Sequence, residues 1–407
     1  MKKVIVIGGG ASGMVAAIVA ARGGADVIIL ERNNNNGKKI LVTGNGKCNY
    51  FNDDFTSKHY YTNSNIDLSL LINDKNKNKI LEFFDSIGVV PMIRDGYYYP
   101  YSNQAVSILN SLLIEISKLN IKIINNFMVE DIIKSNSGYK IIGSDREYIC
   151  DKVILASGSY SYYKYDVINS YDMASKLGLN IVKPMPALVQ LVVNNSITKK
   201  WAGVRVNGIV RLYEDDKFIK EECGEVNFTD YGVSGICIMQ FSNIIARGLL
   251  ENHKYKIKIN FVPSIADNIL DMVSFLDKYD NNCSDRKVIE ILDNIINYKL
   301  GNVIFDKYKD MYYKDLSDEM KKDIALNLIS YNIDIDNTKG YRESQVCSGG
   351  VSLDDINILT MESTNNPGLY IVGELLDITG DCGGYNLGLA WITGIIAGMS
   401  CMGEEND

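Results

Sequence analysis

The sequence contains few of the residue patterns that build metal and dithiol redox sites. Its eight cysteines are scattered, no two form a C-x-x-C pair, and none clusters with His59 or His253, the only histidines. This distribution argues against a structural zinc site and a dithiol motif, so we expect no bound metal. Scattered cysteines in a chain that shows no signal peptide favour the reducing cytoplasm.

The sequence also lacks a long apolar run and an excess of positive charge. No apolar stretch reaches the roughly 20 residues needed to span a membrane, so no membrane association is expected. Lys and Arg number 42 and Asp and Glu 50, a net charge of −8. The acidic balance argues against a nucleic-acid partner. It does not decide whether the folded surface carries a local basic patch. The 407 residues suffice for two to three domains of about 150 residues each.

The first 31 residues alternate apolar and glycine-rich segments. Residues 4–7 and 27–30 are apolar runs rich in β-branched side chains, typical of buried parallel strands. Between them lie G-x-G-x-x-G at 8–13 and helix-forming residues from 12 to 22, and the second run ends at Glu31. This order of strand, glycine-rich turn, helix, strand and acid predicts a Rossmann-type dinucleotide-binding unit.

Each part of that unit has a physical reason. Gly8 permits the tight turn, Gly10 lets the backbone approach a pyrophosphate, and Gly13 lets the helix lie close to the strand. The helix N-terminus offers N–H groups and partial positive charge to the phosphates. Glu31 can accept hydrogen bonds from a ribose, and its charge disfavours a 2′-phosphate there.

A similar pattern recurs near the C-terminus. Residues 368–374 read G-L-Y-I-V-G-E, Asp377 follows, a glycine-rich turn covers 380–388, and a helix of small residues is expected over 390–399. This pattern resembles the second FAD-contact segment of the glutathione-reductase-type flavoproteins. The resemblance implies that the Gly-acid pair lies by the ribityl chain and that the helix N-terminus faces the flavin pyrimidine.

A third segment connects the two ends. Residues 150–159 read C-D-K-V-I-L-A-S-G-S, a strand running into a turn that resembles the A-T-G turn of the same flavoproteins. The three segments together favour FAD over a nicotinamide cofactor as the bound dinucleotide. No second G-x-G-x-x-G follows a strand, so no separate NAD(P)H-binding domain is expected.

The whole chain resembles one family, the BaiN-type or YhiN-like FAD-dependent oxidoreductases, which include aminoacetone oxidase-like flavoproteins. The resemblance is carried by motifs from end to end: G-G-G-A-S-G at 8–13, G-K-K-I-L-V-T-G-N-G-K-C-N at 37–49, Y-P-Y-S-N-Q-A at 99–105, F-T-D-Y-G-V-S-G at 228–235, Q-V-C-S-G-G-V-S at 345–352, and the stretch 367–398.

The resemblance implies an α/β fold: a glutathione-reductase-type Rossmann FAD-binding domain with an inserted β-rich subdomain and a helical subdomain. We predict the FAD-binding domain over 1–186 and 341–407, the β-rich subdomain over 187–262 and the helical subdomain over 263–340. Short alternating apolar runs in the first insertion and amphipathic helical patterns in the second agree with these assignments.

The sequence departs from the family pattern at three places. Residues 157–171 lack several glycines and a proline, the family's G-G-G is Gly44-Asn45-Gly46, and its Thr-His is Thr229-Asp230. These changes fall where flavin or substrate contact is expected. They weaken the prediction of the substrate more than the prediction of FAD as the cofactor.

The loop at 37–49 is dense in Gly, Lys and Asn, and in the family it wraps the FAD pyrophosphate and ribityl chain. Cys48 and Cys382 are each either a flavin-facing thiol or a packed small side chain, and packing is the commoner case. The residues predicted to bind FAD non-covalently are Gly8, Gly10, Ala11, Ser12, Gly13, Glu31, Arg32, Lys38, Lys39, Gly44, Asn45, Gly46, Cys48, Asn49, Val129, Ala156, Ser157, Gly158, Gly373, Glu374, Asp377, Asn386 and Leu387.

Catalytic candidates come from the abundant tyrosines and from one acid. Tyr385 is predicted near the flavin because its motif places it there. Tyr99 lies in Y-Y-Y-P-Y at 97–101, which is either a substrate-stacking surface or an aromatic-rich β-hairpin. Asp230, with Ser234, is predicted to line a substrate cavity at a domain interface. Tyr160, Tyr162 and Tyr163 are weaker candidates of the same kind.

The sequence therefore predicts a cytoplasmic FAD-dependent oxidoreductase that reduces a small organic substrate, with NAD(P)H as a transiently docking electron donor. The alternatives are an amine oxidase that uses oxygen as acceptor and a non-catalytic flavin-binding or RNA-associated protein. The sequence leaves the substrate, the oligomeric state and the proton donor open.

Overall fold

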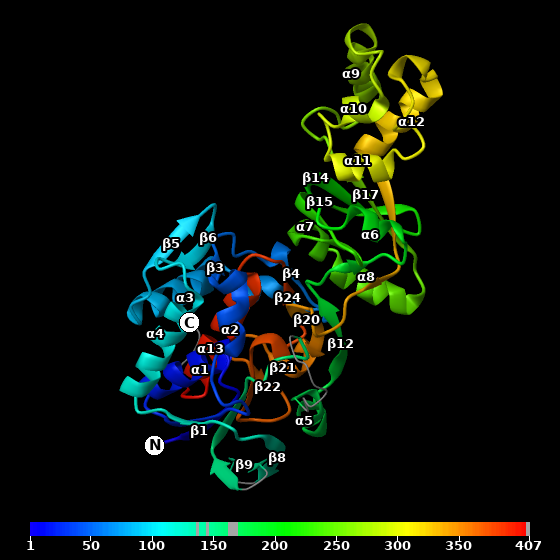
Figure 1. Ribbon diagram of the computed structural model, residues 1–407. Coiled ribbons are helices and arrows are strands. Elements are labelled where there is room, and N and C mark those ends of the chain that lie inside the picture. The colour runs from blue at the N-terminus through cyan, green and yellow to red at the C-terminus, as the bar shows by residue number, and fades with distance from the viewer. Residues whose placement is uncertain (136–137, 144–145, 162–169, 404–407) are drawn as a thin grey trace. The chain divides into compact units, whose positions relative to one another are not determined.

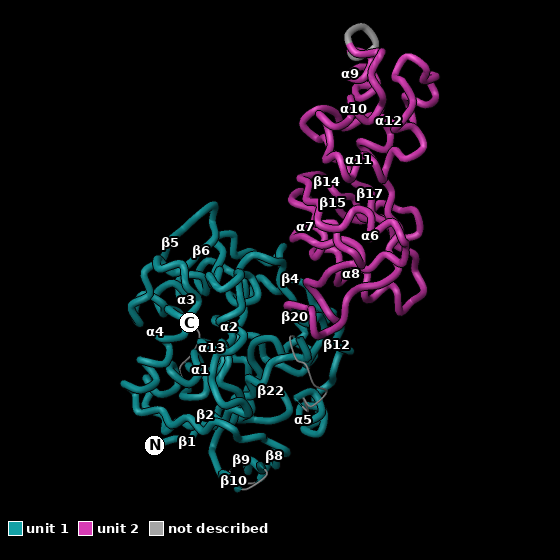
Figure 2. The backbone as a smooth tube through the Cα atoms, in the orientation of Figure 1, with its two compact units in different colours: residues 1–185, 346–407 teal, residues 186–345 magenta. Residues whose placement is uncertain are grey.

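The computed structural model describes residues 1–135, 138–143, 146–161 and 170–403. The chain divides into two compact units, residues 1–185 with 346–407 (unit 1) and residues 186–345 (unit 2), coloured separately in Figure 2. Tyr162 and Tyr163, two of the weaker candidates, lie outside the described residues.

A seven-stranded sheet forms the centre of unit 1, in the order β21-β22-β23-β11-β1-β2-β7. The segment β23-β11-β1-β2-β7 is parallel, and β22 and β21 add to it antiparallel. The central strands β1, β2, β11 and β23 are short apolar runs, each bounded on at least one side by a glycine or an acidic residue. Their bounds are β1 Lys3–Ile7, β2 Asp26–Leu30, β7 Lys122–Ile124, β11 Lys152–Leu155, β21 Ile356–Asn357, β22 Glu362–Ser363 and β23 Leu369–Ile371.

Two helices from opposite ends of the chain, α1 (Ala11–Arg22) and α13 (Tyr385–Ser400), pack directly on each other (Figure 1). Glycine makes this close contact possible. A Cβ at Gly394 would lie 2.6 Å from the Ser12 carbonyl oxygen, and one at Gly398 would lie 2.8 Å from that of Ala16. The small residues in the C-terminal helix therefore serve helix packing.

The remaining elements of unit 1 surround this sheet and these helices (Figure 1). The small sheets have the orders β3-β6-β5, β10-β9-β8, β12-β20 and β24-β4. The bounds are α2 Lys38–Val42, β3 Phe51–Asn52, β4 Tyr60–Tyr61, α3 Asp74–Ser86, β5 Pro91–Arg94, β6 Tyr97–Pro100, α4 Ala105–Lys118, β8 Val129–Ser135, β9 Gly138–Gly143, β10 Glu147–Cys150, α5 Ser170–Lys176, β12 Ile181–Ala187, β20 Val346–Val351 and β24 Thr379–Gly380.

Unit 2 has its own hydrophobic core and a seven-stranded sheet in the order β18-β17-β14-β15-β16-β13-β19. Strands β18 and β19, at 331–338, lie within the range predicted as helical, because β18 pairs antiparallel with β17. The bounds are β13 Leu191–Val192, α6 Ile197–Trp201, β14 Arg205–Glu214, β15 Lys217–Phe228, β16 Gly232–Ser234, α7 Ile236–Met239, α8 Ser242–Gly248, β17 Tyr255–Asn260, α9 Ile269–Asn282, α10 Val288–Leu292, α11 Tyr298–Ile304, α12 Asp318–Ile329, β18 Tyr331–Ile335 and β19 Asn337–Thr338.

Candidate functional site

The glycine-rich turn between β1 and α1 is close-packed on one side and open on the other. Gly8 has a φ of +111°, and a Cβ there would lie 2.4 Å from the Ala156 carbonyl oxygen. A Cβ on Gly13 would lie 2.0 Å from the Gly8 oxygen, whereas one on Gly10 would meet no atom within 4 Å. Helix α1 begins without a side-chain cap and without an acid in its first turn. The turn therefore leaves room and N–H groups for an anion.

Glu31 is buried at the end of β2 and supports this turn. Its carboxylate accepts a 2.7 Å hydrogen bond from the Gly9 amide, and 2.8 Å and 2.6 Å bonds from the backbone and side-chain amides of Asn33. A carboxylate has about four acceptor sites, so room for ribose hydroxyls remains. The structure thus gives Glu31 a second task, because it also fixes the position of the glycine-rich turn.

A polar network joins three of the predicted segments around Glu374. The carboxylate pairs with the Lys39 ammonium and accepts hydrogen bonds from the hydroxyls of Ser159 (2.5 Å) and Ser161 (2.7 Å) and from the Cys347 amide (3.1 Å). The Lys39 ammonium also donates to Ser161 Oγ, at 2.5 Å. Sequence reasoning missed both serines, since they lie in the segment that departs from the family pattern.

The predicted segments also meet at the start of α1. Gly373 has a φ of +68°, and a Cβ there would lie 2.5 Å from Ser12 Oγ. The Gly373 amide donates to Thr393 Oγ1 on α13, at 3.0 Å. The Gly-acid end of β23 is therefore held directly against both α1 and α13.

Three buried polar atoms in these segments have no hydrogen-bond partner among the described residues: Ser157 Oγ, Asn49 Oδ1 and Asn36 Oδ1. Buried polar groups almost always have a partner. A Cβ at Gly46 or Gly158 would meet no atom within 4 Å. Unsatisfied polar atoms beside open glycines fit an extended, polar ligand such as the FAD pyrophosphate and ribityl chain.

Several predicted residues have other structural tasks. The buried Asp377 carboxylate accepts hydrogen bonds from the backbone and side-chain amides of Asn63, both at 2.8 Å. The Asn386 side chain closes the 380–386 turn, donating to the Gly380 carbonyl and accepting from its amide, both at 2.8 Å. FAD contact by these residues stays a prediction.

The other predicted cofactor residues lie on the same elements of unit 1. Lys38 begins α2 and its ammonium reaches Asn33 Oδ1 at 3.2 Å, while Val129 is buried at the start of β8. Ala11 opens α1, and Leu387 lies in the first turn of α13. Gly44 and Asn45 have φ values of +55° and +54°, so the loop after α2 turns back on itself.

The cysteines of this region are protonated thiols at neutral pH. Burial raises the pKa of Cys48 and of Cys382 to about 11. Burial, with the Glu374 carboxylate nearby, raises the pKa of Cys347 to about 12. A thiol reacts as its thiolate, so these pKa values favour packing over a redox role.

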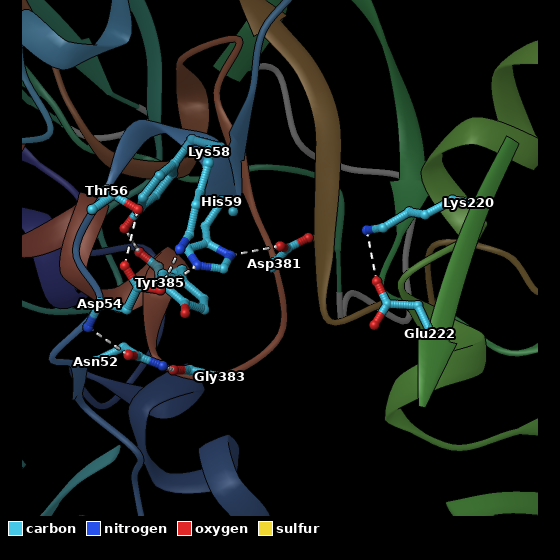
Figure 3. Close-up of polar contacts among 12 residues, drawn as sticks. Asn52, Asp54, Thr56, Lys58, His59, Lys220, Glu222, Asp381, Gly383 and Tyr385 are labelled. Carbon is cyan, nitrogen blue, oxygen red and sulfur yellow. Dashed lines mark hydrogen bonds and ion pairs between the residues drawn. The ribbon is translucent and has the colours of Figure 1, made fainter. Parts of the chain in front are cut away.

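A histidine and two acids surround the N-terminus of α13 (Figure 3). His59 Nδ1 lies 3.0 Å from Asp381 Oδ2, and His59 Nε2 lies 3.0 Å from Asp54 Oδ2. Sequence reasoning left His59 without a role, since it lies in no motif. Its sequence neighbourhood offers only Asp53 and Asp54, since its other partner, Asp381, lies 322 residues away.

Tyr385, a predicted catalytic residue, begins α13 and stacks on the His59 ring, with 4.4 Å between ring centroids and 24° between ring planes. The helix begins five residues before the predicted one, because Gly384, with a φ of +92°, ends the preceding turn. Burial, and then the Asp54 carboxylate, raises the pKa of the Tyr385 phenol well above its ordinary value. Within the described residues its hydroxyl makes no hydrogen bond.

The two other catalytic candidates belong to different units. Tyr99 lies on β6 of a β5–β6 hairpin in unit 1, and burial, with Tyr97 and Cys382 nearby, raises the pKa of its phenol. The Tyr97 ring packs against Gly383, where a Cβ would lie 2.9 Å from it. Asp230 follows β15 in unit 2, and its catalytic role stays a prediction.

The described ranges hold neither a cluster of metal ligands nor a membrane-spanning helix. No group of three or more His, Cys, Asp or Glu there could hold a metal ion. No helix of the described chain is both long and apolar enough to cross a membrane.

A parallel sheet with an uncapped glycine-rich turn, closed by a strand and helix from the far end of the chain, is the arrangement of a Rossmann-type FAD flavoprotein. The chain belongs to the family described as "HI0933-like protein Rossmann domain", whose model matches residues 2–400. It is an FAD-dependent oxidoreductase with an α/β Rossmann-type FAD-binding domain, as the sequence predicted.

The matching relatives include a protein named as a bile-acid reductase and a protein named as a ribosomal RNA dihydrouridine synthase. The 3-dehydro-bile acid delta(4,6)-reductase of Clostridium scindens is 36% identical over 377 residues, 89% of either chain. The ribosomal RNA dihydrouridine synthase of Escherichia coli is 24% identical over 364 residues, 87% of this chain and 86% of that protein. Among solved structures, a 3-ketosteroid-delta4-(5alpha)-dehydrogenase from Rhodococcus jostii is 14% identical with a TM-score of 0.49, and the match covers 99% of this chain and 97% of that one.

Proposed function

We propose that this protein is an NAD(P)H-linked reductase of a carbon–carbon double bond conjugated to a carbonyl group in a small organic molecule. One hydride from NAD(P)H and one proton add across the double bond, which gives the saturated compound and NAD(P)⁺. The 36% identical relative, named as a reductase of an unsaturated bile acid, supports this reaction class.

FAD, when bound, supplies the hydride-transfer chemistry. The residues that would hold it are those at the open side of the α1 turn, around Gly10, together with Glu31 and the unsatisfied hydroxyl of Ser157. The Lys39–Glu374 pair would hold the loop after α2 against the end of β23, so that the polar atoms of both face the same ligand.

The single observation that carries the proposed proton transfer is the state of Tyr385. A tyrosine phenol, with an ordinary pKa of about 10, carries its proton at neutral pH. The Tyr385 hydroxyl makes no hydrogen bond within the described residues, so it is available to a substrate atom that comes within hydrogen-bond reach. We assign Tyr385 Oη as the donor of the proton, which is afterwards replaced from water.

The experiment is anaerobic turnover of the holoenzyme with NADH or NADPH and a panel of unsaturated ketones and acids. The expected product carries two more hydrogens than the substrate, one on each carbon of the former double bond, as mass spectrometry would show. Amines are offered in parallel with oxygen as acceptor. Bleaching of the flavin by an amine and not by NAD(P)H would contradict the reductase and favour the oxidase.

A second candidate is reduction of a uridine base in ribosomal RNA. Two relatives with that name, from Escherichia coli and Haemophilus influenzae, are 24% and 25% identical. The net charge of −8 argues against a polyanionic substrate. Dihydrouridine in ribosomal RNA, lost when the gene is deleted and restored by the wild-type gene, would favour this candidate.

A further inference from the structure

Both ring nitrogens of His59 face carboxylates. Asp381 Oδ2 lies 3.0 Å from Nδ1 and Asp54 Oδ2 lies 3.0 Å from Nε2. An ionised carboxylate accepts hydrogen bonds and cannot donate, so each nitrogen must carry a proton for both bonds to form. The geometry is therefore that of an imidazolium held between two anions.

The groups around His59 favour that charge. Asp54 also pairs with Lys58, at 2.8 Å, and accepts from Thr56 Oγ1, at 3.0 Å. The Lys58 contact, followed by the His59 contact, lowers the pKa of Asp54, so this acid stays ionised. The titratable groups packed around the cluster from the neighbouring elements are Asp381, Tyr385, Tyr60, Tyr97 and Cys382.

His59 also contacts the turn and the helix that follow each other at the start of α13. It stacks on Tyr385, and the His59 carbonyl accepts a 2.9 Å hydrogen bond from the Asp381 amide. Its side chain is only 22% exposed. A cationic ring stacked on the face of an aromatic ring is attracted to it.

We propose that His59 is a positioning residue for Tyr385: as an imidazolium clamped between Asp54 and Asp381, it fixes the plane of the phenol ring and the 380–384 turn. This inference rests on the proposed function, in which Tyr385 donates the proton. Loss of one ring proton would leave a nitrogen lone pair facing a carboxylate and break one side of the clamp.

The first test needs no substrate. The holoprotein is labelled with ¹⁵N-histidine, and its two histidines are assigned with the His253→Gln variant. At pH 7 both His59 nitrogens should show the chemical shifts of an imidazolium. A neutral ring with one unprotonated nitrogen at pH 7 would overturn the proposal.

The second test separates positioning from folding. His59→Phe keeps an aromatic ring against Tyr385 but removes both donors, and Asp54→Asn weakens one side of the clamp. In each we expect kcat for product formation to fall about tenfold to a hundredfold, the size of effect that misplacement causes. The rate of flavin bleaching by NAD(P)H and the FAD content should stay unchanged.

His253 is a matched control because it also faces two carboxylates, Asp215 at 2.6 Å and Glu251 at 3.5 Å, but lies on unit 2. His253→Gln should keep the wild-type kcat. A wild-type kcat in His59→Phe would contradict the clamp. Failure of the wild-type protein to reduce any unsaturated compound would contradict the proposed function alone, since the NMR result decides the clamp independently.

Discussion

Lys39, in the first turn of α2, forms an ion pair with Glu374, 335 residues later in the chain. The two side chains are 37% and 19% exposed, so the pair is partly shielded from solvent. Ser159 and Ser161 add hydroxyl donors from a third segment. One carboxylate thereby fixes the relative positions of three segments that lie far apart in the sequence.

Removing either partner of this pair should weaken FAD binding, and removing both should cost less than the two single losses added together. Lys39→Met leaves the Glu374 charge without its cation, and Glu374→Gln leaves the Lys39 charge uncompensated. We expect each single variant to raise the FAD dissociation constant roughly tenfold to a hundredfold, about 1.4–2.8 kcal/mol. The double variant should lose less than the sum of the two.

The measurement is a double-mutant cycle on FAD release, followed by flavin fluorescence. Lys140→Met is the control, since Lys140 is a similarly exposed lysine that forms an ion pair with Glu147 and is not among the predicted FAD-binding residues. Additive losses, or an equal loss in Lys140→Met, would show that Lys39 and Glu374 act separately.

Glu31→Ala should also weaken FAD binding, by about tenfold to a hundredfold. Hydrogen bonds to a charged group are worth about 1.5–3 kcal/mol, and Glu31 in addition holds the Gly9 and Asn33 amides. The spectrum of bound flavin should stay nearly unaltered, because the adenosine ribose lies far from the ring. Titration of the apoprotein with FAD checks this, and an unchanged dissociation constant would mean that neither the Glu31 carboxylate nor the turn contacts it makes contribute to FAD affinity.

The sheet and the glycine-rich turn could be predicted from sequence because their signals are local. Apolar β-branched runs at β1 and β2 and the spacing of Gly8, Gly10 and Gly13 depend only on neighbouring residues. The His59 cluster could not be predicted in this way. Its partner Asp381 lies 322 residues away, so only the folded chain shows that they meet.

The first residue of α13 and the hydrogen bonds of Ser159 and Ser161 could not be predicted from the sequence either. A glycine-rich run predicts a turn, but only the left-handed Gly384 determines where the turn ends and the helix begins. Ser159 and Ser161 lie in a segment rich in Ser and Tyr, where no spacing distinguishes a buried donor from a surface hydroxyl.

The buried thiols should be unreactive and dispensable for redox chemistry. With its pKa at about 11, Cys48 would be on the order of one part in a thousand thiolate at pH 8. We expect slow alkylation by iodoacetamide in the folded protein, and activity retained in Cys48→Ala and Cys382→Ala. Loss of turnover in Cys382→Ala with FAD still bound would indicate a catalytic thiol.

The same thiol should make the fold sensitive to alkali. Burial raises the pKa of Cys48 from an ordinary value of 9.0 to about 11 in the folded protein, so the unfolded chain loses this proton first. Its contribution to stability is complete below pH 9 and is lost as the pH rises toward 11. Urea unfolding at pH 8 and pH 10.5 should show a larger loss in the wild type than in Cys48→Ala.

The protein should bind NAD(P)H weakly and should discriminate little between NADH and NADPH. No second glycine-rich dinucleotide motif exists in the sequence, so little surface beyond the reacting ring is expected to hold the donor. We expect a KM toward the upper part of the ~1 μM–1 mM range, measured by anaerobic flavin bleaching against donor concentration. Of the lysines that could select a 2′-phosphate, Lys38 is exposed, while Lys164 lies outside the described residues. Micromolar, strongly selective binding would reveal a dedicated site.

The most direct test of the proposed reaction is stopped-flow kinetics of Tyr385→Phe, which removes one hydroxyl and keeps the ring that stacks on His59. Anaerobic bleaching of the flavin by NAD(P)H should proceed at the wild-type rate. Recovery of flavin absorbance on mixing with the unsaturated substrate should slow about 10²- to 10⁴-fold, the usual contribution of a general acid. Recovery at the wild-type rate would contradict the assignment of Tyr385 as proton donor.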